Sequence, residues 1–172
     1  MTTLALPAVR TRSYEWADPT LTAAAAMQTS GLEFLRQLVA GELPPPPMAV
    51  TLGMSIVDVA EGRAVFEVEP AEWHYNPIGV VHGGLAATVL DSALGCAVQS
   101  TLPAGVGYTT VELKVNLVRA ITYASGPLRA EATIVHRGRR MATAEGRLTS
   151  ADGRLYAHGS TTCMILGPPN DS

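Results

Sequence analysis

The residues from Leu85 to Val98 form an apolar run that constrains the fold more than any other stretch of this 172-residue chain. The run is apolar on every face at helical spacing, which predicts a helix enclosed by other structure. One residue does not fit this pattern: Asp91 is a carboxylate in the middle of the predicted helix. Because an unpaired buried charge is costly, we expect Asp91 to be paired, neutralised or used.

On both sides of this run, apolar and polar residues alternate with the two-residue period of strands. We predict two strands before the helix, with a hairpin turn at Glu61-Gly62, and four strands after it, the last two joined by a turn at Asp152-Gly153. A twisted antiparallel sheet wrapped around one apolar helix satisfies this order, so the predicted fold class is α+β. The six strands are expected at 51–59, 63–69, 108–117, 128–136, 140–149 and 155–166.

The chain ahead of this domain is expected to form an arm and a short helical extension. Residues 1–28 show no period that would bury a face, so we expect partial order there. From Ser30, an N-cap candidate, apolar residues recur at helical spacing up to Gly41, and the prolines at 44–47 end this amphipathic helix. The predicted organisation is an N-terminal arm and helix (1–47), a main domain (48–166) and a polar tail (167–172).

Composition excludes several classes of function. A net charge of −3 lacks the basic excess of a nucleic-acid-binding protein. No apolar run is long enough to span a membrane and the start lacks a signal peptide, so we expect a cytoplasmic protein that does not associate with membranes. Cys96 and Cys163 are expected to be small core residues, and the four histidines show no metal-ligand spacing, so we predict no metal.

One set of residues around the helix start carries a family resemblance. Asn76, Gly79, His82-Gly83-Gly84 and Asp91 resemble the motif of the hotdog-fold acyl-CoA thioesterases of the phenylacetate-degradation (PaaI-like) type. The resemblance extends over about residues 48–166. It implies a hotdog fold, hydrolysis of an acyl- or aryl-CoA thioester to the free acid and CoA, and Asp91 as nucleophile or general base. It also implies no separate cofactor, since coenzyme A is part of the substrate.

Two alternatives of different class stay open at this point. One is a hotdog dehydratase or hydratase that acts on 3-hydroxyacyl thioesters. The other is a hotdog subunit that binds an acyl thioester without catalysis. The sequence does not specify the acyl group, nor whether CoA or an acyl carrier protein is the donor.

The residues that open the helix have chemistry that suits a thioester. The N–H groups of Gly83 and Gly84 are unpaired at the positive end of the helix and could stabilise an oxyanion, although such a glycine pair could also serve only packing. Asn76 matches a position whose side-chain amide, in enzymes of the resembled family, binds the thioester carbonyl or positions water. Asn76-Pro77 could equally be plain turn chemistry. We expect His82 to support the loop by hydrogen bonding.

The spacing of these residues predicts a shared site. Gly83 and Asp91 are eight residues apart, which is about 12 Å along one helix. One thioester carbonyl cannot contact both, so the two groups must come from different chains. This predicts a homodimer with antiparallel central helices, which the resemblance also implies. The family commonly pairs such dimers into tetramers.

The CoA phosphates call for basic groups at the mouth of the site. Arg137, Arg139 and Arg140 cluster in one turn, with Lys114 and Arg119 as further candidates, and any of them could instead be solvated surface charges. The resemblance implies a Ser or Thr after the helix, a role that Thr109 or Thr110 would take. Trp73 and His74 could line the acyl pocket, with packing as their alternative role.

Overall fold

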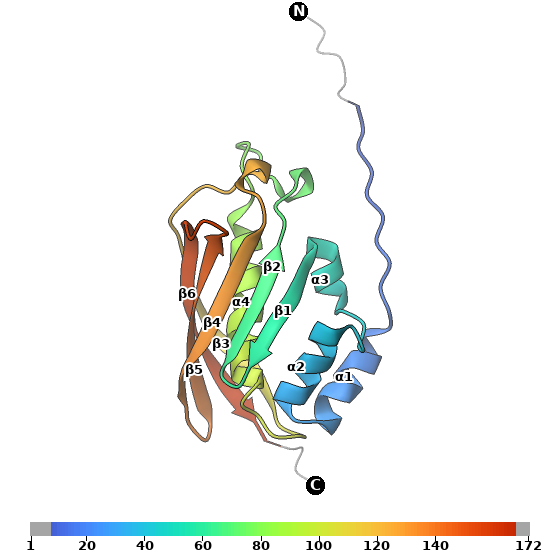
Figure 1. The fold of residues 1–172 in the computed structure, drawn as a ribbon, viewed down its shortest axis with the longest axis vertical. Coiled ribbons are helices and arrows are strands. Elements are labelled where there is room, and N and C mark those ends of the chain that lie inside the picture. The colour runs from blue at the N-terminus through green and yellow to red at the C-terminus, as the bar shows by residue number, and fades with distance from the viewer. Residues whose placement is uncertain (1–7, 168–172) are drawn as a thin grey trace, which may run out of the picture.

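The computed structural model of the chain describes residues 8–167, so the first part of the predicted arm (1–7) and residues 168–172 of the predicted tail lie outside it. Six antiparallel strands form one sheet in the order β1-β2-β4-β5-β6-β3, and this sheet curves around the helix α4 (Figure 1). No helix within residues 8–167 is long and apolar enough to cross a membrane. The strands are β1 (Met54–Ala60), β2 (Arg63–Val68), β3 (Gly107–Leu117), β4 (Leu128–Arg137), β5 (Met141–Ser150) and β6 (Leu155–Leu166).

The core lies between α4 (Gly83–Gln99) and the concave face of the sheet. Val89, Leu90 and Leu94 are fully buried on the helix side. The facing strand positions alternate inward and outward, and many inward residues are alanines, such as Ala130 and Ala144, which let the long helical side chains interdigitate closely with the sheet. The predicted arrangement of one antiparallel sheet around a long apolar helix is confirmed.

The two edges of the sheet differ. β1 is short, carries a bulge between Ile56 and Asp58, and is covered by the helix α2 (Gly31–Ala40). β3 has 11 residues, pairs with β6 on one side, and exposes Val111 and Leu117, which are 50% and 57% accessible. A covering helix protects an edge from pairing with another chain, so within residues 8–167 the β3 edge is the one left open for pairing.

Two predictions for the N-terminal part are wrong. Residues 19–28 form the helix α1 (Pro19–Gln28), where we expected an arm with partial order. Asp18 caps this helix by accepting the Thr20 N–H at 2.9 Å, and Pro19 stands at its start, but its apolar residues follow no amphipathic period and so gave no signal. Residues 51 and 52 belong to the helix α3 (Pro47–Leu52) rather than to the first strand, because Gly53 ends α3 in the left-handed conformation, with φ at 65°.

The helix α2 has the predicted ends. The Ser30 hydroxyl accepts the Glu33 N–H at 3.3 Å, and Gly41 ends the helix in the left-handed conformation. The start of α2 touches the end of α4: the Gly31 N–H donates to the Leu102 carbonyl at 2.9 Å, and a Cβ at Gly31 would overlap the Gln99 carbonyl oxygen. This close approach, which only glycine permits, joins the helical extension to the main domain.

Candidate active site

Asp91 lies on the face of α4 that turns toward the helix α2 and the edge strand β3. It is partly exposed, as are Thr88 and Ser92 on the same face. We expected a helix enclosed on all sides, and within one protomer this expectation is wrong for that face. The Thr110 hydroxyl on β3 donates a hydrogen bond to the Asp91 carboxylate at 3.1 Å. Among residues 8–167 Asp91 therefore has a neutral donor beside it and forms no ion pair.

A hollow of about 720 Å³ opens beside Asp91. Its polar lining comes mainly from α4 and β3, and its apolar lining from α2, the loop that follows it, and β1. This volume is typical of a site that encloses a small organic ligand. Apart from Asp91 and Thr110, the residues around this hollow were not predicted as site residues: Phe34, Leu35, Leu38, Val39, Gly41, Leu43, Pro44, Pro45, Pro46, Ala49, Met54, Ser55, Ile56, Phe66, Ser92, Cys96, Gln99 and Tyr108.

Some of these residues had a signal in the sequence. Ser92, Cys96 and Gln99 follow Asp91 at helical spacing and share its face of α4. The residues of α2 and its loop had none, because the pattern of an amphipathic helix does not tell which element its apolar face will contact.

The other ionisable groups near Asp91 stay protonated. Burial and the nearby Asp91 charge raise the pKa of the Cys96 thiol to about 12. Burial also raises the pKa of the Tyr108 phenol well above its usual value, and its hydroxyl lies against Gly95, where a Cβ would collide with it. Since a thiol must ionise to act as a nucleophile, Asp91 is the group in this hollow suited to act as nucleophile or base at neutral pH.

Asn76 and Gly83 meet at a second hollow, of about 290 Å³, at the start of α4. The Asn76 Oδ1 accepts the N–H groups of Ile78 at 3.0 Å and Val80 at 3.3 Å, so the turn role of this side chain is present. Because these bonds use only the oxygen, they orient the Asn76 amide nitrogen as a donor. The turn role and a carbonyl-binding role are therefore compatible in one side chain.

His82 caps the helix α4. Its Nδ1 accepts the Gly84 N–H at 2.9 Å, and its own backbone N–H donates to the His74 carbonyl at 2.7 Å. This is the supporting type of contact expected for His82. It also changes the predicted pair of oxyanion donors, since the Gly84 N–H is already satisfied by the imidazole.

The Gly83 N–H remains available for the donor role that was predicted for both glycines. Its N–H is in the first turn, where no intrahelical acceptor exists, and it has no acceptor among residues 8–167. A Cβ at this position would collide with Leu117 Cδ1. The lack of a side chain at Gly83 therefore keeps the start of the helix accessible beside β3.

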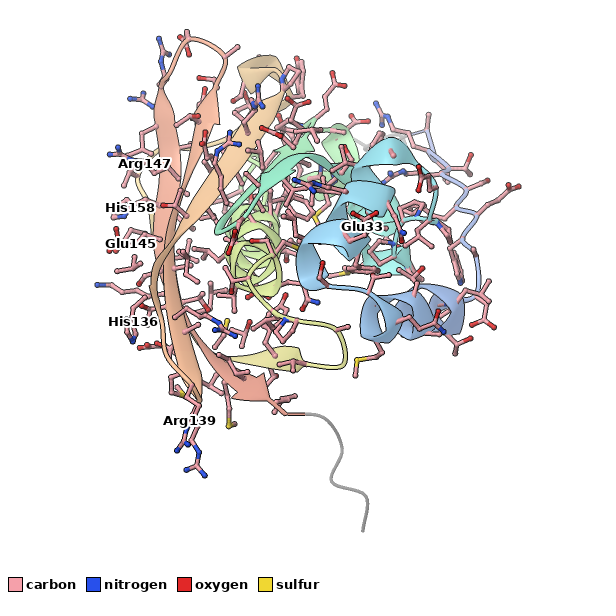
Figure 2. All side chains as sticks on the ribbon, turned by 60° about the horizontal axis from the view of Figure 1, so that its bottom comes forward. Glu33, His136, Arg139, Glu145, Arg147 and His158 are labelled. Atoms are coloured by element: carbon pink, nitrogen blue, oxygen red, sulfur yellow. The ribbon has the colours of Figure 1, made fainter. Side chains whose placement is uncertain are left out.

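The structure brings some of the predicted CoA-binding residues toward Asp91 and separates others from it. Thr110 contacts Asp91, whereas Thr109 is exposed and alternates to the other face of the strand. Lys114 lies on the outer face of the sheet, in a polar hollow with Glu145, Arg147 and His158. Figure 2 shows these last three side chains pointing away from α4, so the sheet separates Lys114 from Asp91.

The three arginines of the β4–β5 turn lie at the same end of the sheet as the start of β3. Met141, the first residue of β5 after this turn, pairs with Met164 of β6. On its other side Met164 pairs with Thr109 near the start of β3, so the turn and the start of β3 lie at the same end of the sheet. Arg137, Arg139 and Arg140 are all exposed, and Figure 2 places Arg139 at the tip of this end. Arg119 instead lines the hollow with Asn76 and Gly83, so candidate cations are present near both hollows.

His74 has the packing contacts that were the alternative to an acyl-pocket role, and neither His74 nor the exposed Trp73 lines the hollow beside Asp91. His74 is buried, its Nδ1 accepts the Ala71 N–H at 3.0 Å, and its Nε2 lies 3.0 Å from the Leu52 carbonyl, which fits a neutral ring. Burial lowers the pKa of His74, in keeping with this. Trp73 lies under the Arg12 guanidinium, 4.1 Å from the ring centroid. Within residues 8–167 no cluster of three or more His, Cys, Asp or Glu side chains is arranged to hold a metal.

Comparisons with known proteins identify the family. The family model described as "Thioesterase superfamily" matches residues 78–157, which include Gly83 and Asp91. Human acyl-coenzyme A thioesterase 13 is 30% identical over 141 residues, which cover 78% of this chain and 96% of the relative. A protein of Halobacterium salinarum named "putative esterase" is 37% identical over 99 residues, covering 55% of this chain and 64% of the relative.

A solved structure extends this likeness to three dimensions. A protein of Ralstonia eutropha described as a "putative thioesterase, phenylacetic acid degradation-related protein" superimposes with a TM-score of 0.68 and 32% identity over 76% of this chain and 98% of its own. The chain therefore belongs to the thioesterase superfamily and has its hotdog fold. The predictions of a hotdog fold and of a thioester hydrolase are confirmed at this level of family and enzyme class.

Proposed function

We propose that the chain is an acyl-CoA thioesterase, and that each active site combines Asp91 of one protomer with Gly83 and Asn76 of another. The observation that carries this proposal is the separation of the two hollows. One holds the carboxylate and its Thr110 partner, and the other holds the two donors. Each protomer thus has both halves of a hydrolytic site, but at different places along α4.

The helix geometry prevents one protomer from using both halves on the same bond. Gly83 and Asp91 are separated by about 12 Å of helix axis, whereas an oxyanion donor and a base must each lie within about 3 Å of the reacting group. A twofold axis that makes two α4 helices antiparallel would place the Gly83 end of one beside Asp91 of the other. It would create two identical sites.

The surface of the protomer supports such a dimer. The open edge strand β3 passes Asp91 at Thr110 and ends at Leu117, next to Gly83. Pairing of this edge with its twofold copy would bury Val111 and Leu117, and would cover the exposed face of α4. A tetramer would need a further interface, for which the outer face of the sheet is available.

In the proposed reaction, the thioester carbonyl accepts hydrogen bonds from the Gly83 N–H and the Asn76 amide. These donors stabilise the negative charge that develops on the oxygen as the carbonyl is attacked. Asp91 either removes a proton from the attacking water or attacks the carbonyl itself to give a mixed anhydride, which water then hydrolyses. In both routes the C–S bond breaks, CoA leaves as a thiolate that takes up a proton, and the acid is released.

The arginine turn is the proposed binding site for the CoA phosphates. Arg137, Arg139 and Arg140 are exposed at the end of the sheet where β3 begins, near the Asp91 half of the site. Guanidinium groups suit phosphate oxygens because they donate in pairs from a planar fork. Lys114 has no part in this proposal, since it lies on the other face of the sheet.

The dehydratase and binding-subunit alternatives have less support. A dehydratase of this fold needs a histidine as a catalytic base, and the Nδ1 of His82 already accepts the Gly84 N–H. A binding subunit needs no exposed carboxylate beside an apolar hollow, a group that costs desolvation energy whenever a ligand covers it. Hydration of crotonyl-CoA without thiol release would favour the first alternative.

Subunit complementation tests the shared site directly. Asp91→Asn and Gly83→Val variants should each be inactive in a thiol-release assay with acyl-CoA. After mixing and exchange of subunits, half of the dimers are hybrids, and each hybrid has one intact site out of two. We therefore expect about a quarter of wild-type activity to return. Proven exchange without any regained activity would count against a site made from two chains.

An isotope experiment separates the two chemical routes. A single turnover in H₂¹⁸O, with enzyme in excess over acyl-CoA, leaves ¹⁸O in the Asp91 carboxylate only if that carboxylate formed the anhydride and water attacked its carbonyl carbon. Label found only in the released acid excludes water attack on the Asp91 carbon of an anhydride and is the result expected for Asp91 as general base. Mass spectrometry of the peptide that contains Asp91 gives the readout.

A further inference from the structure

Residues 34–46 lie outside the part of the chain that the family model matches, yet they form one side of the hollow beside Asp91. We propose that this segment, called the acyl wall below, selects the acyl group, and that the preferred group is an unbranched aliphatic chain of medium length. The inference deepens the proposed function, because it assigns a substrate class to the same site.

The side chains that the acyl wall contributes to the hollow are all apolar. Its contribution to the hollow contains no side chain that can donate or accept a hydrogen bond. A hydroxylated ring or a second carboxylate would lose its water there without a new partner, which costs binding energy. The residues of the acyl wall that line the hollow are Phe34, Leu35, Leu38, Val39, Gly41, Leu43, Pro44, Pro45 and Pro46.

The hollow is polarised in the direction that an acyl thioester requires. Asp91 and Thr110 lie on its polar side, where the thioester carbon would react. The acyl wall lies across from them on α2, and Figure 2 shows α4 between the sheet and this helix. An aliphatic chain attached to the reacting carbonyl would extend from the polar side toward the acyl wall, and about 720 Å³ is far more than a two-carbon group would fill.

The acyl wall is held rigidly enough to discriminate between chain lengths. Gly31 joins the start of α2 to the end of α4, and the buried side chain of Leu35, 1% exposed, fixes the middle of the helix. The proline run that follows has fixed φ angles and little conformational freedom. A rigid apolar wall should reward each added methylene by about fourfold in kcat/KM until the hollow is full.

Leu38 offers a test with a matched control. Leu38 and Leu32 are both half-buried leucines of α2, but only Leu38 lines the hollow. Wild type and the variants Leu38→Trp, Leu38→Ala, Leu32→Trp and Leu32→Ala are assayed for thiol release with straight-chain acyl-CoAs from butanoyl to tetradecanoyl, and with phenylacetyl-CoA. The experiment compares the chain length at which kcat/KM is highest.

We expect Leu38→Trp to move this optimum to shorter chains and Leu38→Ala to move it to longer ones. For butanoyl-CoA, the shortest substrate, the change in kcat/KM on either Leu38 substitution should be the smallest of the series. The Leu32 variants should keep the wild-type optimum. An optimum that stays in place in both Leu38 variants, an equal shift in the Leu32 variants, or a wild-type preference for phenylacetyl-CoA over every aliphatic substrate would overturn the proposal.

Binding of S-alkyl-CoA thioethers, which cannot be hydrolysed, separates this proposal from the proposed function. Calorimetry should show an affinity that rises with alkyl length in wild type, with the same displacement of the optimum in the Leu38 variants. Chain-dependent binding without hydrolysis of any acyl-CoA would refute the proposed function and leave the acyl wall in place. Hydrolysis that ignores chain length and Leu38 would refute the acyl wall and leave the proposed function in place.

Discussion

The two ends of the exposed face of α4 differ in what they provide. The Gly83 end provides hydrogen-bond donors, from a glycine N–H and from an asparagine amide that the loop holds in place. The Asp91 end provides a carboxylate, a hydroxyl and an apolar hollow. Neither set can hydrolyse a thioester alone, because a base without oxyanion donors, or donors without a base, supplies only part of the stabilisation.

This difference teaches how one helix can serve two sites. A helix separates its first turn from its third by a fixed distance, so in the proposed function the complementary groups at these positions act together only across two copies. Variants at the Asp91 end should affect the attack on the carbonyl. Variants at the Gly83 end should affect charge stabilisation on its oxygen.

The largest effect is expected for Asp91→Asn. The substitution keeps the shape of the side chain and a hydrogen bond with Thr110. It removes the carboxylate that, in the proposed reaction, attacks the thioester carbonyl or activates water. We expect kcat/KM for an acyl-CoA to fall by about 10³-fold, measured by thiol release. Because Asp91 is partly exposed, the thermal midpoint should barely change. Activity within a factor of ten of wild type would remove Asp91 from the chemistry.

At the other end, Asn76→Ala should lower kcat/KM by about 10²-fold, since it removes an oxyanion donor. It also removes the acceptor for Ile78 and Val80, so the loop itself would change. Asn76→Asp is the matched control, because a carboxylate still accepts both N–H groups but no longer donates. We expect both variants to be poorly active and only Asn76→Ala to lose thermal stability. An active Asn76→Asp enzyme would reduce Asn76 to a turn residue.

Most of the fold could be predicted because its periodicities are strong. The strand from 155 to 166 was predicted at its observed bounds, and α4 differs from the apolar run only by its glycine start and its last residue. The helices α1 and α3 were missed for local reasons. α1 buries only Thr22 and so needs no amphipathic pattern, while α3 is a six-residue helix set by Pro47 and Gly53.

The site was harder to predict than the fold. The sequence placed Asn76, Gly83 and Asp91 near one helix, but whether Thr109 or Thr110 meets Asp91 depends on strand register, which a bulge between Thr110 and Glu112 changes. Whether the Gly84 N–H is free to bind an oxyanion depends on the rotamer of His82, whose Nδ1 accepts it. Tertiary contacts of this kind leave no periodic signal.

A smaller effect is expected for Thr110→Val, which keeps the shape of the side chain and removes the hydroxyl. The Asp91 carboxylate would lose the donor that holds one of its oxygens at 3.1 Å. Loss of one hydrogen bond to a charged group should lower kcat/KM by about tenfold. Thr110→Ser, which restores the hydroxyl, should remain close to wild type in the same assay. Equal rates for the valine and serine variants would show that Thr110 does not position the carboxylate.

The smallest effect on catalysis is expected for His82→Ala. The Gly84 N–H would lose its acceptor, and a lost helix cap costs about 1 kcal/mol, which corresponds to about 2–4 °C in the thermal midpoint of a chain of this size. His82→Asn can accept the same N–H and should restore the midpoint, because capping needs an acceptor but no imidazole. Hydrolysis should change little in either variant. If both variants instead lost activity as completely as Asp91→Asn at an unchanged midpoint, the imidazole would belong to the chemistry, and the Gly83 end would supply a proton-transfer group in addition to its donors.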